Sequence, residues 1–249
     1  MTLQQFFTQN PRIALAFSGG VDSSYLLYAA KAFGAHVRAY YVKTPFQPQF
    51  EYDDAMALAQ QLNMPVSVLK IDILSDSSIA ANPHNRCYFC KKRIFKAILE
   101  AAARDGFTCI MDGTNASDDA ADRPGMQALQ ELQVRSPLRE CGLTKEDIRH
   151  FSKQAGLFTH DKPAYACLAT RIPTGTAITE DLLARTERSE EFLKTLGFTD
   201  FRIRLMGDAA KLQLPESQLP LLLQHRETVV QTLKKDYSAV LLDLEVRHA

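Results

Sequence analysis

The chain has 249 residues, 46% of them hydrophobic, which suffices for one large domain or two modest ones with a buried core. Lysine plus arginine and aspartate plus glutamate both number 29, so the net charge is zero, which argues against a broad nucleic-acid surface. No apolar run approaches about 18 residues and residues 1–10 are polar, so we expect no membrane span, no signal peptide and a cytoplasmic location.

Short apolar runs alternate with amphipathic helical patterns through the first two thirds of the chain. Strands are predicted at residues 12–17, 36–42, 66–71 and 107–111, and helices at residues 23–33, 51–62 and 88–103. Such alternation is typical of an α/β fold in which helices cover both faces of a parallel sheet. Ligands in these folds bind beyond the carboxyl ends of the strands, where we expect the polar loops 18–22, 44–50 and 112–118.

The first of these loops joins a predicted strand to a predicted helix and has the sequence Ser18-Gly19-Gly20-Val21-Asp22-Ser23. Its glycines permit close backbone approach, and the N–H groups of such a turn favour an anion such as phosphate. The spacing is not that of a Walker loop, and an ordinary glycine turn with Asp22 or Ser23 capping the helix is the alternative. The six residues resemble the PP-loop of the ATP pyrophosphatase superfamily, which holds the pyrophosphate end of ATP during adenylation.

The loop after the fourth predicted strand has the sequence Asp112-Gly113-Thr114-Asn115-Ala116-Ser117-Asp118. Taken alone it predicts a polar turn. Beside a PP-loop it resembles the second nucleotide loop of the same superfamily, which implies that Gly113, Thr114 and Asn115 contact ATP. Asp118 is then a candidate Mg²⁺ ligand, with Asp119 and Asp122 as alternatives, because Mg²⁺ in such sites takes one or two carboxylates plus phosphate oxygens.

The pattern changes after Pro173, where a smaller α/β unit is predicted. Its helices are expected at residues 179–196 and 219–233, and its strands at residues 201–205, 211–214 and 239–244. We therefore divide the chain into a nucleotide domain, residues 1–170, and a smaller domain, residues 171–249, for substrate binding or oligomerisation. Before the boundary, Thr144 and Asp147 form a capping-box pattern that starts a helix at residues 144–155, for which we expect a structural role.

The cysteines are five, an odd number that suggests thiols in catalysis or metal binding rather than disulfides. Cys87 and Cys90 form a C-x-x-C motif that opens a predicted helix next to basic residues, where thiols ionise more easily. This spacing leaves redox chemistry, zinc and iron–sulfur ligation open, although zinc usually needs a second pair. Cys167 lies between the predicted domains, where a small apolar core residue is the alternative. Cys109 is expected in the core, and Cys141 has no assigned role.

In combination, these motifs resemble the LarE family, the PP-loop sulfur transferases of nickel-pincer cofactor biosynthesis. The matching segments are residues 18–23, 86–91, 113–118, 136–145, 162–173 and 175–179. The resemblance extends from about residue 12 to residue 214, and its most specific part surrounds Cys167, because generic PP-loop enzymes lack that segment. It implies an adenine nucleotide alpha hydrolase-like fold and an ATP-dependent sulfurtransferase that forms AMP and pyrophosphate.

The resemblance also implies a substrate and a source of sulfur. ATP is expected to adenylate a carboxylate of pyridinium-3,5-biscarboxylic acid mononucleotide, and sulfur then displaces AMP to leave a thiocarboxylate. In relatives with only the cysteine equivalent to Cys167, that residue donates its own sulfur and becomes dehydroalanine. In relatives with equivalents of Cys87, Cys90 and Cys167, the three hold a [4Fe–4S] cluster that carries an extra sulfide. We favour the cluster form because this chain has all three cysteines.

Three charged residues of the second domain complete the implied site. Arg202 and Arg204 alternate on one predicted strand and so project to one face, where the family binds the substrate phosphate; a solvated strand face is the alternative. Glu190 matches an acidic position near the active cysteine and is a further candidate Mg²⁺ ligand, with a salt-bridged helix surface as the alternative. The His-Gly-Asp…Arg-Ile-Glu pattern frequent in the family is replaced at residues 206–213, which leaves the exact substrate open.

Other functions are kept as alternatives. A PP-loop tRNA thiolase predicts a basic surface and usually an RNA-binding appendage, neither of which is evident in the sequence, and a non-catalytic ATP-binding regulatory protein predicts no pyrophosphate release. A glutamine-dependent amidotransferase partner leaves the three cysteines unexplained. The resemblance implies a homo-oligomer, a small-molecule substrate, sulfide or another sulfur donor, and partners in nickel-pincer biosynthesis. No nucleic-acid or membrane partner is expected.

Overall fold

A computed structural model describes residues 1–118 and 123–245; Asp119 and Asp122, the alternatives to Asp118, lie outside these ranges. The chain divides into two units. The first contains Met1–Ile73 and Asn85–Ala164, and the second contains Leu74–His84 and the chain from Tyr165 onward. No helix within the described ranges is both long and apolar enough to cross a membrane.

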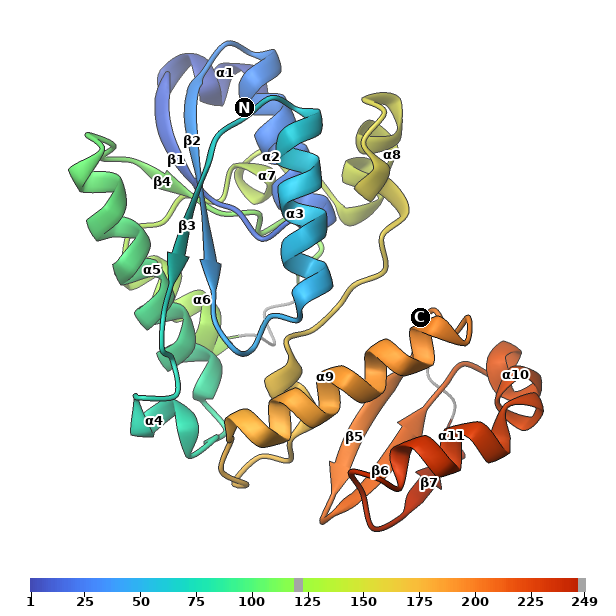
Figure 1. Ribbon diagram of the computed structural model, residues 1–249. Helices are drawn as coiled ribbons and strands as arrows, with labels where there is room; N and C mark the ends of the chain where they lie inside the picture. The colour runs from blue at the N-terminus through green and yellow to red at the C-terminus, as the bar shows by residue number, and fades with distance from the viewer. Residues whose placement is uncertain (119–122, 246–249) are drawn as a thin grey trace. The chain divides into compact units, whose positions relative to one another are not determined.

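Within the described residues, the first unit is built on a parallel sheet with the strand order β3-β2-β1-β4 (Figure 1). The strands are β1 (Arg12–Ala16), β2 (His36–Lys43), β3 (Val66–Lys70) and β4 (Ile110–Met111). They follow the apolar runs, because strands buried on both faces require nearly continuous hydrophobic sequence. The predicted α/β fold with a parallel sheet is thus confirmed, although the fourth strand is shorter than predicted.

Helices cover both faces of this sheet (Figure 1). One face carries α1 (Leu3–Gln9), α2 (Val21–Ala32), α3 (Gln49–Gln61) and α8 (Lys145–Gln154), and the other carries α5 (Arg86–Arg104) and α6 (Arg123–Glu131). Successive strand residues point to opposite faces, so Leu15 joins the first core and Ala14 the second. The short helices of this unit are α7 (Pro137–Glu140) and the 3-10 helix η1 (Phe158–Asp161).

The strand order brings two of the predicted loops side by side. β2 and β3 extend the sheet on one side of β1, whereas β4 pairs with β1 on its other side. Because β1 and β4 are parallel, the loops that follow them leave from the same edge of the sheet. Open parallel sheets bind ligands in the crevice where the strand order reverses, as it does here at β1. The loops that begin at Phe17 and Asp112 therefore flank the expected ligand position.

The second unit has, in the part that the structure describes, a three-stranded sheet of order β5-β6-β7. β5 (Arg202–Met206) and β6 (Ala209–Gln213) form an antiparallel hairpin, and β7 (Val240–Leu242) pairs with β6 in parallel. The helices are α4 (Ser77–Ala80), α9 (Glu180–Thr195), α10 (Leu219–Gln224) and α11 (Arg226–Leu233), with 3-10 helices η2 (Leu168–Arg171) and η3 (Glu216–Gln218). The prediction of a single helix at residues 219–233 is therefore wrong, since the helix is interrupted at His225, between α10 and α11.

Residues 74–84 leave the first unit and join the second. The Asn82 amide donates to the Pro173 carbonyl at 2.9 Å, and the Gly175 N–H donates to the Asn82 carbonyl at 2.8 Å. The chain enters this unit again at Tyr165, close to the boundary that we predict at residue 170. The division of functions between the two predicted domains stays a prediction.

Candidate functional site

The loop between β1 and α2 forms one side of the candidate site. Gly19 has φ +73°, and a Cβ on it would lie 2.5 Å from the Cβ of Ala55 on α3, so glycine is required there. Ser23 Oγ accepts from the Ser18 N–H at 3.2 Å, and the two hydroxyls lie 3.0 Å apart. The loop is therefore closed on itself and packed against α3.

The start of α2 offers backbone donors to an anion. Its N-cap is Gly20, and no described side chain caps it. The alternative in which Asp22 or Ser23 caps this helix is therefore wrong. The first N–H groups of a helix lack partners within it, and the helix dipole adds positive potential there. Such a turn is suited to phosphate.

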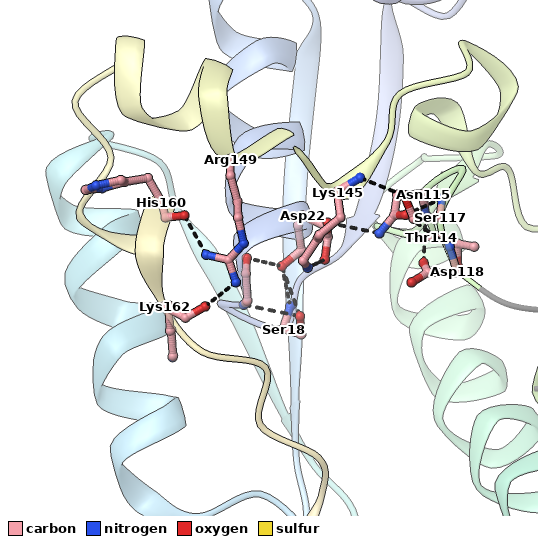
Figure 2. A network of polar contacts seen from close by, with 12 residues as sticks. Ser18, Asp22, Thr114, Asn115, Ser117, Asp118, Lys145, Arg149, His160 and Lys162 are labelled. Atoms are coloured by element: carbon pink, nitrogen blue, oxygen red, sulfur yellow. Dashed lines mark hydrogen bonds and ion pairs between the residues drawn. The ribbon is translucent and has the colours of Figure 1, made fainter. Parts of the chain in front are cut away.

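The loop after β4 lies directly against the first loop (Figure 2). A Cβ on Gly113 would lie 2.9 Å from the backbone nitrogen of Ser23, so the two loops approach as closely as glycine allows. The Asn115 amide donates to Asp22 Oδ1 at 3.1 Å. The residues that we predict to hold the nucleotide phosphates thus lie together at the carboxyl ends of β1 and β4.

Asp112 organises this second loop, a role that the sequence alone does not predict. The hydroxyls of Thr114 and Ser136 donate to its carboxylate at 2.5 and 2.7 Å, and the residue is buried. Burial raises the pKa of Asp112, and the hydrogen bonds oppose this shift. The carboxylate therefore ties the loop to the segment that precedes α7.

Asp118, the candidate Mg²⁺ ligand, is exposed at the end of the same loop. Its Oδ2 accepts from the Asn115 N–H at 2.8 Å, and Arg139 donates to its carbonyl at 2.6 Å. Asp22, Asp112 and Asp118 line one cavity, so carboxylates of the kind that Mg²⁺ takes beside phosphates are present. Among the described residues, no three His, Cys, Asp or Glu side chains are grouped as a metal site.

Lys145 completes the polar end of the site. Its ammonium group lies 2.5 Å from Asp22 Oδ2, and its N–H donates to Ser117 Oγ at 3.0 Å (Figure 2). The predicted capping box of Thr144 and Asp147 is confirmed, and it places Lys145 in the first turn of α8. The sequence predicts a structural role for this helix, and Lys145 is a functional candidate that it misses. Its place in one of the segments that carry the resemblance is the signal that could have identified it.

A cavity of about 350 Å³ is bounded by the two loops, β2 and α5. Its polar lining comes mostly from the loops. Its apolar lining on β2 and α5 includes Tyr40, Val42, Ile94, Phe95 and Ile98. The third predicted loop, residues 44–50, contributes Gln47. A cavity with an apolar wall and a polar end that carries backbone donors can hold a purine nucleotide and its phosphates.

The C-x-x-C motif begins the helix that lines this cavity. Cys87 and Cys90 lie in the first two turns of α5, where Cys87 is exposed and Cys90 is buried. Arg86 Nη2 lies 4.0 Å from Cys87 Sγ. Lys91, the residue after Cys90, lines the cavity. Both thiols are therefore within about one helical turn of a cavity-lining residue.

Cys167 belongs to the second unit, where it immediately precedes η2. Its carbonyl accepts from the N–H and the hydroxyl of Thr170 at 3.0 and 2.8 Å. Arg171 donates to the Ala166 carbonyl at 3.0 Å. These bonds hold the backbone on either side of the thiol. The convergence of Cys167 with Cys87 and Cys90 stays a prediction.

All five cysteines lie in the described ranges, and none of them forms a disulfide. Cys109 and Cys141 are half-buried, and burial raises the pKa of each thiol. A raised pKa keeps a thiol neutral and unreactive at neutral pH. Neither residue is therefore a good candidate for sulfur chemistry.

Glu190 is the centre of a buried polar cluster in the second unit. Its Oε1 accepts from Arg171 Nε at 2.8 Å and from the Ile203 N–H at 3.0 Å. Its Oε2 accepts from the Tyr165 hydroxyl at 2.5 Å. Since 2% of Glu190 is exposed, the alternative of a salt-bridged helix surface is wrong. Both carboxylate oxygens are already engaged by hydrogen-bond donors.

Arg202 and Arg204 lie beside the segment that carries Cys167. The guanidinium carbon of Arg202 lies 5.1 Å from the centre of the Tyr165 ring, and Arg204 donates to the Thr170 carbonyl at 2.7 Å. Arg202 is 6% exposed, so the alternative of a solvated strand face is wrong at this position. The two guanidinium groups bring positive charge to this part of the second unit.

Comparison with known proteins finds relatives of similar length, although no protein-family model matches the sequence. The chain is 35% identical to an uncharacterized protein of Synechocystis sp., over 98% of the chain and 92% of that protein. It is 33% identical to the pyridinium-3,5-bisthiocarboxylic acid mononucleotide synthase of Lactiplantibacillus plantarum, over 94% of the chain and 86% of the synthase. A tRNA-specific 2-thiouridylase of Clostridium botulinum is 30% identical over 60% of the chain and 52% of that enzyme.

Proposed function

The chain belongs to the LarE family of PP-loop sulfur transferases, and from this premise we propose that it uses ATP to convert a carboxylate of a pyridinium mononucleotide into a thiocarboxylate. One observation carries the proposal: the phosphate loop and the helix that begins with Cys87 and Cys90 line the same cavity. This neighbourhood suits a reaction in which a nucleotide activates the substrate and thiols handle the sulfur. The relative from Lactiplantibacillus plantarum is named as a synthase of such a thiocarboxylic acid mononucleotide.

We assign the cavity to ATP. The N–H groups of residues 21–23 at the start of α2 and of Gly113 would bind the phosphates, with Ser18, Thr114 and Asn115 shaping the two loops, and the apolar wall on β2 and α5 would receive the adenine. Lys145, now paired with Asp22, would give its positive charge to a phosphate. Asp118, with Asp22 nearby, would hold Mg²⁺, which supplies further positive charge to the phosphates.

The reaction needs two exchanges of bonds. A carboxylate oxygen of the substrate attacks the α-phosphorus of ATP, and the bond to the β-phosphate oxygen breaks, so pyrophosphate leaves. Sulfide then attacks the acyl carbon, and the bond from that carbon to the AMP oxygen breaks with its electron pair. The products are a thiocarboxylate and AMP. Adenylation is required because oxide is a poor leaving group, and backbone N–H groups aimed at the phosphates stabilise the developing charge.

Cys87, Cys90 and Cys167 are proposed to deliver the sulfur. Thiolates are the ligands of iron–sulfur clusters, and the three-residue spacing puts Cys87 and Cys90 on one face of α5. A [4Fe–4S] cluster held by three thiolates supplies an open iron that can bind sulfide.

The alternative is a sacrificial reaction of Cys167. Its thiolate would attack the acyl adenylate, and AMP would leave to give a thioester. Loss of a proton from the α-carbon and cleavage of the bond between the β-carbon and sulfur would then release the thiocarboxylate. Dehydroalanine would remain at residue 167, so each chain would act once.

Arg202 and Arg204 are proposed to bind the phosphate of the substrate, because paired guanidinium groups suit that anion. The contact of Arg204 with the Thr170 carbonyl supports this assignment, since it brings the pair beside the segment of Cys167. Glu190 is assigned to positioning rather than to Mg²⁺, because Arg171 and Tyr165 engage its oxygens. We further propose a homo-oligomer in the reducing cytoplasm, where the thiols persist.

The deciding experiment is purification without oxygen, reconstitution with iron and sulfide, and assay with ATP and the pyridinium biscarboxylic acid mononucleotide. We expect about four irons per chain and broad visible absorbance that is lost in Cys87→Ala, Cys90→Ala and Cys167→Ala. Iron-free protein that forms thiocarboxylate and loses the mass of H₂S would favour the sacrificial reaction. If neither form releases substrate-dependent pyrophosphate or makes thiocarboxylate, the proposal is wrong.

A tRNA thiolase is the second candidate, favoured by the partial similarity to a tRNA-specific 2-thiouridylase. The zero net charge of the chain argues against it. Incubation with tRNA, ATP and sulfide separates the two functions. Thiolated uridine without thiocarboxylate would favour the thiolase, and the absence of both products would favour a non-catalytic ATP-binding protein.

A further inference from the structure

The segment that connects α8 to the second unit is fastened at two points before it leaves the first unit. Arg149, on α8, makes the first fastening. Its Nη1 donates to the His160 carbonyl at 2.7 Å, and its Nη2 donates to the Lys162 carbonyl at 2.9 Å (Figure 2). One guanidinium group therefore fixes the backbone of this segment close to its end.

The side chain of Lys162 makes the second fastening. Its ammonium group lies 2.8 Å from Asp54 Oδ2 and 3.2 Å from Glu51 Oε1, and 12% of the side chain is exposed. Both contacts are ion pairs. The side chain of Glu51 is 14% exposed, so removing the charge of Lys162 would leave a largely buried carboxylate without this ion pair, which is costly. The side chain of Lys162 is thus held on α3.

The two carboxylates lie on the helix that supports the phosphate loop. Ala55, next to Asp54 on α3, is the residue against which Gly19 packs with no room for a Cβ. Lys162 is therefore tied to the same turn of α3 that sets the position of Gly19. The exit of the chain from the first unit is fixed with respect to the phosphate loop.

A short length of chain then leads to the thiol. Cys167 is the fifth residue after Lys162, and five residues span at most about 18 Å when fully extended. The ring of Pro163 further restricts the chain directly after Lys162. Cys167 thus lies on a tether of fixed origin and limited reach.

We infer that Lys162 and Arg149 form an anchor that limits how far Cys167 can move from α3, the helix that supports the phosphate loop, so that sulfur reaches the acyl adenylate before water does. The inference rests on the proposed sulfur transfer. Lys162 and Arg149 are both positioning residues. Without the anchor, the tether begins at the buried residue Thr159 and grows from five residues to eight. A longer and less restricted tether lowers the effective concentration of Cys167 at the acyl carbon.

The ratio of thiocarboxylate to AMP tests this inference, because the anchor acts on sulfur transfer and not on adenylation. Lys162→Met keeps the length of the side chain and removes its charge. We expect pyrophosphate release within about twofold of the native rate and a ratio lowered about tenfold, since small displacements of a reacting group have effects up to about 100-fold. Arg149→Met, which removes the other fastening, should have the same effect. Lys162→Arg keeps the charge and should retain most of the coupling.

Arg38→Met is the matched control, because it removes a partly exposed ion pair with Asp105, 3.2 Å long, in the amino-terminal half of β2. Hydrogen exchange of residues 158–166 is a second readout, which should be faster in both anchor variants and unchanged in the control. If the Lys162→Met variant does not fold, Asp54→Asn replaces it in the test. It weakens the same ion pair by changing a carboxylate whose side chain is 39% exposed.

Three results would contradict these ideas, and they separate the anchor from the proposed function. Native protein that forms thiocarboxylate, together with anchor variants that keep the native ratio, would overturn the anchor while leaving the proposed function intact. The anchor would also be overturned if Arg38→Met lowered the ratio as much as Lys162→Met. Native protein that forms no thiocarboxylate would instead reject the proposed function.

Discussion

Lys145 and Asp22 form an ion pair of 2.5 Å that joins the start of α8 to the start of α2, although 123 positions separate them in the chain. The Asn115 amide donates to the other oxygen of the same carboxylate. Asp22 thus holds together the three segments that bound the phosphate end of the cavity. A nucleotide phosphate can compete with Asp22 for the ammonium group, so we predict that Lys145 contributes to the binding of ATP.

Lys145→Met should weaken ATP binding without unfolding the protein. Loss of a charge-assisted hydrogen bond costs about 1.5–3 kcal/mol, so we expect the Kd for ATP to rise at least about tenfold. Lys153→Met removes an exposed lysine from the same helix and should leave the Kd unchanged. Isothermal titration calorimetry with a non-hydrolysable ATP analogue measures both. Equal affinities of the two variants would remove Lys145 from the site.

Gly19→Ala should abolish nucleotide binding. The new Cβ would lie 2.5 Å from Ala55 at a backbone φ of +73°, so the phosphate loop must move. Gly34 is a matched control, because its φ is +74° and nothing lies within 4 Å of a Cβ there. We expect both variants to lose about 1 kcal/mol or more from backbone strain, and Gly19→Ala alone to lose ATP binding. Retained binding in Gly19→Ala would show that the loop does not hold the phosphates.

Local signals explain why much of this site is predictable from sequence. The capping box of Thr144 and Asp147 appears as predicted, because a cap depends on residues within one turn. The phosphate loop and the loop after β4 follow from the alternation of strands and helices, since parallel strands end at one edge.

The remaining features depend on contacts that no local pattern contains. The pair of Lys145 and Asp22 and the burial of Asp112 arise from packing between distant segments. The helix α1 lies in a polar stretch, yet Phe6 and Phe7 bury against the core and a capping box at Thr2 starts it. Tertiary burial, rather than periodicity, stabilises so short a helix.

Asp112 should make stability depend on pH in the acidic range. Burial raises its pKa above the unfolded value, so its contribution is fully present below the unfolded pKa and is lost as pH rises through the folded pKa. Asp112→Asn removes this titration. The unfolding free energy of the native protein should therefore fall relative to that of Asp112→Asn as the pH rises above the unfolded pKa of about 4. Urea denaturation of both proteins at several pH values measures the difference, and a difference that does not change with pH would contradict the assignment.

Glu190→Gln should destabilise the second unit strongly. It removes the charge that balances Arg171, whose side chain is 1% exposed, and a buried charge left without its partner costs about 3–5 kcal/mol. Glu191→Gln changes the exposed neighbour on the same helix and should cost less than about 0.5 kcal/mol. Thermal unfolding followed by circular dichroism compares the two variants. Similar melting temperatures would mean that the cluster around Glu190 is not important for stability.

Cys167→Ala should abolish sulfur transfer and leave adenylation largely intact. The phosphate loop, Lys145 and Asp112 all belong to the first unit, whereas Cys167 belongs to the second, so its thiol is not needed to bind ATP or to release pyrophosphate. The acyl adenylate should then be lost to water, and pyrophosphate should form without thiocarboxylate. Cys141→Ala is the control, because burial raises the pKa of that thiol and it should transfer sulfur like the native protein. Pyrophosphate measured against thiocarboxylate separates the two steps, and persistent transfer in Cys167→Ala would show that the sulfur comes from elsewhere.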